Sequence, residues 1–121
     1  MNTLLLIEDD LMILDTTREL LKLLGYQVYT AKSGGSALDL LAGCNGEIDL
    51  VLLDLSLQDM DGRKLLVKMV EQYPGLKFVI CSGSLPDELD FEQHPAVKGI
   101  LHKPFELNDL RKIVEKVING E

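Results

Sequence analysis

The stretch Leu50-Val51-Leu52-Leu53-Asp54 indicates the fold class most directly, because four consecutive apolar residues end in a carboxylate. An unbroken apolar run is typical of a strand covered on both faces, as in a parallel sheet. We therefore predict a strand over residues 48–54. A second run of this kind, Leu4-Leu5-Leu6-Ile7, predicts another buried strand of the same sheet.

Strand-like and helix-like segments alternate along the chain. Short apolar or β-branched runs predict strands over residues 4–7, 26–30, 48–54, 77–82 and 97–102. Apolar residues at helical spacing predict helices over 11–24, 36–41, 86–92 and 107–118, and one that begins at Gly62. Five βα units in this order imply a doubly wound α/β fold, a three-layer sandwich with helices on both faces of a parallel sheet. The 121 residues suit one domain over residues 1–121.

The composition narrows the class of protein. A hydrophobic fraction of 46% with 26% charged residues is ordinary for a soluble globular protein. The formal net charge of −8 argues against nucleic-acid and anionic-membrane surfaces, because both need clustered Lys and Arg. We expect no membrane span, because no stretch of about eighteen apolar residues occurs, and no secretory leader, because Met1-Asn2-Thr3-Leu4 lacks a basic start. Cys44 and Cys81 lack metal-ligand spacing, so we expect reduced thiols and a cytoplasmic location.

Candidate site residues stand at the carboxyl ends of the predicted strands, except the second, which ends in Thr30-Ala31-Lys32 and offers nothing comparable. In open α/β sheets, ligands bind beyond the carboxyl ends of the strands. The residues found there are Glu8, Asp9, Asp10, Asp54, Ser82 and Lys103. We therefore expect these side chains to meet at one edge of the sheet.

Several carboxylates at one edge repel one another, by about 4 kcal/mol for two charges 4 Å apart at an effective dielectric of 20. A divalent cation relieves this repulsion, and oxygen ligands suit Mg²⁺ rather than zinc. Because Mg²⁺ often keeps a phosphate oxygen among its ligands, a phosphoryl group fits the site. Lys103 and the Ser82 hydroxyl are suited to other phosphoryl oxygens, which leaves Asp54 as the nucleophile.

Each residue also has a simpler explanation. Asp9 or Asp10 could cap the following helix, and Asp54 could be a turn residue. Ser82 could belong to a loop, and Lys103 could be a solvated strand end. Taken together, however, these separate explanations would make it a coincidence that acids, a hydroxyl and a lysine all end different strands at one edge of the sheet.

Four spaced motifs resemble the receiver domains of response regulators, the CheY-like family. They are LLIEDD at 5–10, VLLD at 51–54 with MDG at 60–62, VICSG at 79–83, and HKPF at 102–105. The resemblance covers essentially the whole chain and implies a flavodoxin-like sheet of order 2-1-3-4-5. It also implies a histidine kinase or a histidine phosphotransfer domain as partner, and Mg²⁺ as cofactor.

The resemblance assigns a role to each site residue. Asp54 would accept a phosphoryl group from phosphohistidine. Asp9 would bind Mg²⁺ directly and Glu8 through water, and the backbone carbonyl of Ser56 would complete the protein ligands. The phosphoryl group would be bound by Ser82, the switch hydroxyl, and by Lys103, whose peptide bond to Pro104 is often cis in the family.

Three positions depart from the family pattern. Glu8 replaces the commoner Asp, and Leu57-Gln58 stands where Met-Pro is frequent, so the loop after Asp54 would differ in shape. Ile100 occupies the place of a Tyr or Phe and cannot reproduce an aromatic rotamer switch. The segments around Ser82-Gly83 and 99–105 look more like receivers attached to hybrid histidine kinases.

The leading hypothesis is a phosphoacceptor signalling module that is not an enzyme acting on external substrates. A pseudo-receiver that acts by contact alone is one alternative. A Mg²⁺-dependent aspartyl-phosphate phosphatase is another, but such enzymes usually carry a second Asp where this chain has Ser56. We expect a monomer or weak dimer, with the last helix and its neighbours as the reporting surface; the output partner is not specified.

Overall fold

The computed structural model describes residues 2–55, 57–82 and 94–120. Its elements, in chain order, are β1 (Thr3–Ile7), α1 (Leu11–Leu23), β2 (Gln27–Ala31), α2 (Gly34–Gly43), β3 (Leu50–Asp54), α3 (Gly62–Gln72), β4 (Phe78–Ser82), β5 (Val97–His102) and α5 (Leu107–Asn119). The predicted helix over 86–92 lies outside the described residues. Ser56 and the side chain of Ser82 also lie outside them.

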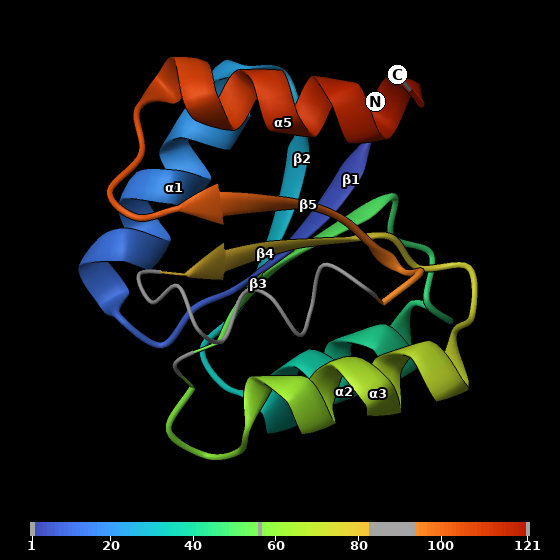
Figure 1. Ribbon diagram of the computed structural model, residues 1–121. Helices are drawn as coiled ribbons and strands as arrows, with labels where there is room; N and C mark the ends of the chain where they lie inside the picture. The colour runs from blue at the N-terminus through green and yellow to red at the C-terminus, as the bar shows by residue number, and fades with distance from the viewer. Residues whose placement is uncertain (1, 56, 83–93, 121) are drawn as a thin grey trace.

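The five strands form one parallel sheet in the order β2-β1-β3-β4-β5, which confirms the predicted fold class and strand order. Figure 1 shows three layers, with α1 and α5 over one face of the sheet and α2 and α3 over the other. The central pairs run in register from Leu4 opposite Leu50 to Asp54 opposite Cys81. Because all strands run the same way, all their carboxyl ends lie at one edge.

The core consists of two clusters of apolar side chains, one on each face of the sheet. Alternate residues of β1 and β3 point to opposite faces, as the two-residue period of a strand requires. Leu5, Ile7, Val51 and Leu53 pack on the α2 and α3 side, whereas Leu4, Leu6, Leu50 and Leu52 pack on the α1 and α5 side. All five residues of β3 are buried, so the unbroken apolar run was a correct indication of a doubly covered strand.

Two details differ from the sequence-based expectation. Helix α2 begins at Gly34, two residues before the predicted start, because the Ser33 side chain caps it by accepting the N–H of Ser36. The helical spacing of the last helix places Leu107, Leu110, Val114, Val117 and Ile118 on one face; in α5, Leu110, Val114 and Val117 are buried, but Leu107 is 41% exposed and does not join the core. No helix in the described part of the chain has both the length and the apolar character to cross a membrane.

Gly62 begins α3 where the helix passes close to the residue after β3. A Cβ atom at position 62 would lie 2.9 Å from Leu55 Cα and 3.2 Å from the Leu55 carbonyl oxygen. Because backbone atoms cannot move aside cheaply, we expect Gly62→Ala to lower the free energy of unfolding in urea by about 1–3 kcal/mol.

The matched control is Gly43→Ala, because a Cβ atom at that helical position would meet nothing within 4 Å. Removing a helical glycine there should leave stability unchanged or raise it by about 0.5–1 kcal/mol. Equal losses in the two variants would contradict the steric explanation.

Candidate functional site

The candidate site lies at the edge of the sheet toward which the arrowheads of β4 and β5 point in Figure 1. Glu8 directly follows β1, and Asp54 is the last residue of β3, the neighbouring strand. Lys103 directly follows β5, two places beyond β3 in the sheet. Three residues that are distant in sequence therefore share one edge.

The Lys103 ammonium joins two buried carboxylates. Its Nζ lies 2.8 Å from Glu8 Oε1 and 3.1 Å from Asp54 Oδ1. Glu8 and Asp54 are each only 3% exposed. Asp9 adds a third carboxylate, and one ligand oxygen from each of the three acids lies within 4.8 Å of the others. The cluster thus combines three acids with one ammonium in a largely water-excluded place.

Burial and the neighbouring charges shift the pKa values of Glu8 and Lys103. Burial raises the pKa of Glu8 to about 7 from 4.5; the hydrogen bond and the charge of Asp54 act in the same direction, and Lys103 opposes them. For Lys103, burial lowers the pKa. The hydrogen bond to Glu8 and the charges of both acids outweigh that effect and raise the pKa above its ordinary value. Lys103 therefore stays charged at neutral pH, while Glu8 is partly protonated.

The two aspartates after Glu8 have different roles. Asp10 is the N-cap of α1, and its Oδ1 accepts the N–H groups of Met12 and Ile13 at 3.0 and 3.2 Å. Asp9 lies in the acid cluster, and its Oδ2 accepts the N–H of Gln58 at 3.1 Å. The capping explanation thus holds for Asp10, whereas Asp9 faces the site.

The remaining predicted residues are placed only in part. The backbone of Ser82 pairs with that of His102 at the end of the sheet. The Lys103–Pro104 peptide bond is cis. Ile100 is half-buried and packs against the core cluster on the α2 and α3 side. The functional roles suggested for Ser56, Ser82 and Ile100 stay predictions.

The structure adds one acidic residue that sequence reasoning did not assign. Asp59, in the loop between β3 and α3, accepts the backbone N–H groups of Gly34 and Gly35 at 2.9 and 3.0 Å. These bonds lower the pKa of Asp59. Asp59 and the two glycines are more than twenty residues apart in sequence, so no local pattern predicts their contact. The sequence offered only a carboxylate and a pair of glycines without an assigned role.

An apolar groove of about 450 Å³ opens beside the acid cluster. It runs between α1 and the segment after β5, and it is lined by Met12, Ile13, Thr16, Thr17, Leu20, Lys103, Pro104 and Phe105. Met12, at its rim, is 80% exposed. The groove connects an exposed apolar surface with the lysine that contacts Asp54.

The acid cluster fits a hard divalent cation. Its three acids, Glu8, Asp9 and Asp54, provide only oxygen ligands, which suit Mg²⁺ rather than zinc. Three carboxylates against the one charge of Lys103 also leave an excess of negative charge, which a divalent cation would neutralise. The residues are therefore suited to holding Mg²⁺.

Comparisons with known proteins agree with this arrangement. The family model described as "Response regulator receiver domain" matches residues 4–115. The chain is 30% identical over 118 residues to sporulation initiation phosphotransferase F of Bacillus subtilis, covering 95% of this chain and 92% of that protein. It is 33% identical over 120 residues to the sensor kinase CckA of Brucella abortus, covering 98% of this chain but only 13% of the kinase.

A solved structure has the same fold. The CheY-like receiver domain protein from Methanospirillum hungatei superposes with a TM-score of 0.88 at 30% identity, and the match covers 99% of this chain and 95% of that one. Fold, strand-end residues and sequence similarity all agree, so this chain belongs to the receiver domains of response regulators in two-component systems.

Proposed function

We propose that Asp54 accepts a phosphoryl group from a phosphohistidine donor, with Mg²⁺ held by Glu8, Asp9 and Asp54 itself. The observation that carries this proposal is the contact of the Lys103 ammonium with Asp54 Oδ1 at 3.1 Å, inside a cluster of three carboxylates. Receiver domains act with histidine kinases or phosphotransfer proteins. The similarity to a protein named as a phosphotransferase supports the same reaction here.

In the proposed transfer, a carboxylate oxygen of Asp54 attacks phosphorus and forms an acyl phosphate. The P–N bond to the histidine ring breaks, and its electron pair remains on the ring nitrogen. Lys103 keeps one positive charge beside the reacting carboxylate, because its pKa is raised. Bound Mg²⁺ would supply charge neutralisation for the phosphoryl oxygens. This chain thus contributes the acceptor and positions the charges around it, and we propose no turnover of external substrates.

The similarity to a sensor kinase favours phosphorelay as the output. Ile100 packs half-buried against the core and carries no aromatic ring, so an aromatic rotamer switch is not part of the proposed signal. Onward transfer of the phosphoryl group, or a conformational change elsewhere in the domain, remains as the means of output.

Acetyl phosphate with Mg²⁺ should add one phosphoryl group to the wild-type chain, as measured by intact mass. The adduct should be removed by hydroxylamine and should be absent from Asp54→Asn and from a Mg²⁺-free sample. Asp39→Asn, which changes an exposed aspartate of α2, is the matched control and should be labelled like the wild type. Labelling of Asp54→Asn, or failure with both acetyl phosphate and a panel of phosphorylated histidine donors, would sink the proposal.

The raised pKa of Glu8 predicts a pH-dependent stability of the metal-free protein. The folded-state value, about 7, exceeds the ordinary 4.5, so the folded chain binds more protons between these values. In urea and EDTA, wild type should lose on the order of 2 kcal/mol relative to Glu8→Gln as the pH rises from 5 to 8. At pH 8, Mg²⁺ should restore the stability of wild type more than that of Glu8→Gln.

Glu47→Gln changes an exposed glutamate and should follow the wild-type pH profile. A difference between wild type and Glu8→Gln that stays constant over this pH range would refute a raised Glu8 pKa.

We further propose that a histidine-bearing donor helix docks in the groove beside α1, because the groove leads to Lys103 and the donor phosphorus must reach Asp54. Met12→Glu places a charge at the rim, at a helix N-terminal position that tolerates acids. Transfer from a phosphorylated histidine phosphotransfer protein should slow about tenfold, as expected for loss of an exposed apolar anchor. Labelling by acetyl phosphate should not change.

Val67→Glu, at an exposed position of α3 on the opposite face of the sheet, is the control and should transfer at the wild-type rate. An equal loss in both variants, or a parallel loss with acetyl phosphate, would show that the groove is not the docking surface.

A further inference from the structure

The loop between β3 and α3 is hydrogen-bonded to two separate parts of the protein. On one side, the Gln58 N–H donates to Asp9 Oδ2 at 3.1 Å. On the other side, the Asp59 carboxylate accepts the N–H groups of Gly34 and Gly35 at 2.9 and 3.0 Å. Adjacent loop residues thus connect the acid cluster with the start of α2.

Asp59 is not needed to cap α2 in the ordinary way. Ser33 already occupies the N-cap position, and its hydroxyl oxygen accepts the Ser36 N–H at 3.1 Å. Asp59 uses both carboxylate oxygens for the N–H groups of Gly34 and Gly35, the first two of the helix, whereas the Ser33 hydroxyl accepts the third. The carboxylate also lies favourably at the positive end of the helix dipole. Asp59 therefore joins the loop to α2 rather than starting the helix.

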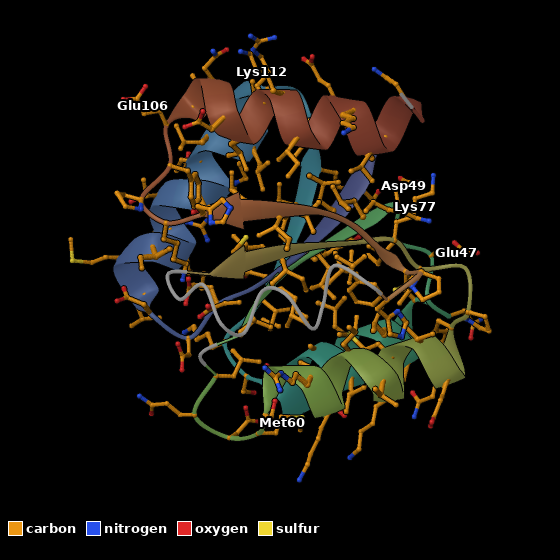
Figure 2. All side chains as sticks on the ribbon, viewed as in Figure 1. Glu47, Asp49, Met60, Lys77, Glu106 and Lys112 are labelled. Atoms are coloured by element: carbon orange, nitrogen blue, oxygen red, sulfur yellow. The ribbon has the colours of Figure 1, made fainter. Side chains whose placement is uncertain are left out.

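Packing reinforces this junction. A Cβ atom at position 34 would lie 2.5 Å from the Met60 sulfur, so Met60 occupies the space that Gly34 leaves free. Met60, labelled in Figure 2, packs against the core cluster on the α2 and α3 side. Two adjacent loop residues, Asp59 and Met60, thus contact the start of α2.

The other side of the loop acts on the acid cluster. The N–H of Gln58 occupies one oxygen of Asp9 and restricts rotation of its carboxylate. Metal-binding carboxylates generally depend on hydrogen bonds of this kind, which orient them for the ion. A proline at position 58 could not donate this bond, because proline has no N–H.

We propose that Asp59 is a positioning residue of the receiver site: by holding the loop on the N-terminus of α2, it keeps the Gln58 N–H on Asp9 and the Asp9 carboxylate in place for Mg²⁺. This inference rests on the proposed role of Asp9 as a Mg²⁺ ligand. Asp59 is not one of the three acids of the cluster; it acts through Gln58.

Asp59→Ala should weaken Mg²⁺ binding by about threefold to tenfold, as measured by calorimetric titration of the unphosphorylated protein. This loss is at or below the one usually seen when a residue that orients a metal ligand is removed. Amide hydrogen exchange should speed up at Gln58 as well as at Gly34 and Gly35. Gln58→Pro removes the same bond to Asp9 and should weaken binding similarly. Because both changes break one chain of contacts, the double variant should lose no more than the larger single loss.

Two controls separate positioning from other effects. Asp39→Ala makes the same charge change at an exposed position of α2 and should bind Mg²⁺ like the wild type. Ser33→Ala removes the N-cap hydroxyl of α2, with a loss of about 1 kcal/mol in stability, but leaves the Asp59 contacts in place. It should also keep wild-type Mg²⁺ affinity, whereas a loss equal to that of Asp59→Ala would show that helix destabilisation is the cause.

The outcomes also distinguish this inference from the proposed function. If the wild type binds Mg²⁺ and Asp59→Ala binds it equally well with unchanged exchange at Gln58, Asp59 is not a positioning residue, although the metal site stands. If the wild type binds no Mg²⁺, the metal site fails. Exchange at Gln58 then still reports whether Asp59 holds the loop.

Discussion

The burial of β3 on both faces constrains the rest of the structure. A strand without an exposed side chain needs helices over both of its faces, and α1 with α5 and α2 with α3 supply them. The same burial extends to the last residue of the strand, Asp54, which is only 3% exposed. A carboxylate in such a place requires a charged partner, and Lys103 is that partner at 3.1 Å. Fold and site thus both depend on one central strand.

The sequence was sufficient for most of the fold. Unbroken apolar runs identified the central strands, because most side chains of a strand covered on both faces lie in an apolar core. The strand order followed from the family resemblance. The predicted start of α2 was two residues too late, because Gly34 and Gly35 do not indicate a helix by their residue type. Their helical conformation is stabilised by the Ser33 cap and the Asp59 carboxylate. A cap provided by a distant loop has no local signal.

The site was predictable to the extent that it depends on topology. Glu8, Asp54 and Lys103 lie together because parallel strands end at one edge. The residue pattern alone did not decide which aspartate after β1 faces the site, because Asp9 and Asp10 differ only in the direction that the backbone gives them; the family resemblance assigned Asp9. The raised pKa of Glu8 likewise depends on burial and on the distance to two charges, and neither quantity can be read from a motif.

The contact between Met60 and Gly34 has a consequence for how this chain tolerates change. The two positions share one small volume, since any side chain at position 34 would overlap the Met60 thioether. Residues on α2 and on the loop after β3 are therefore not independent in a library of variants. Selection that enlarges position 34 should therefore favour clones in which the Met60 side chain has shifted or has been replaced by a smaller one, so that substitutions at the two positions are coupled.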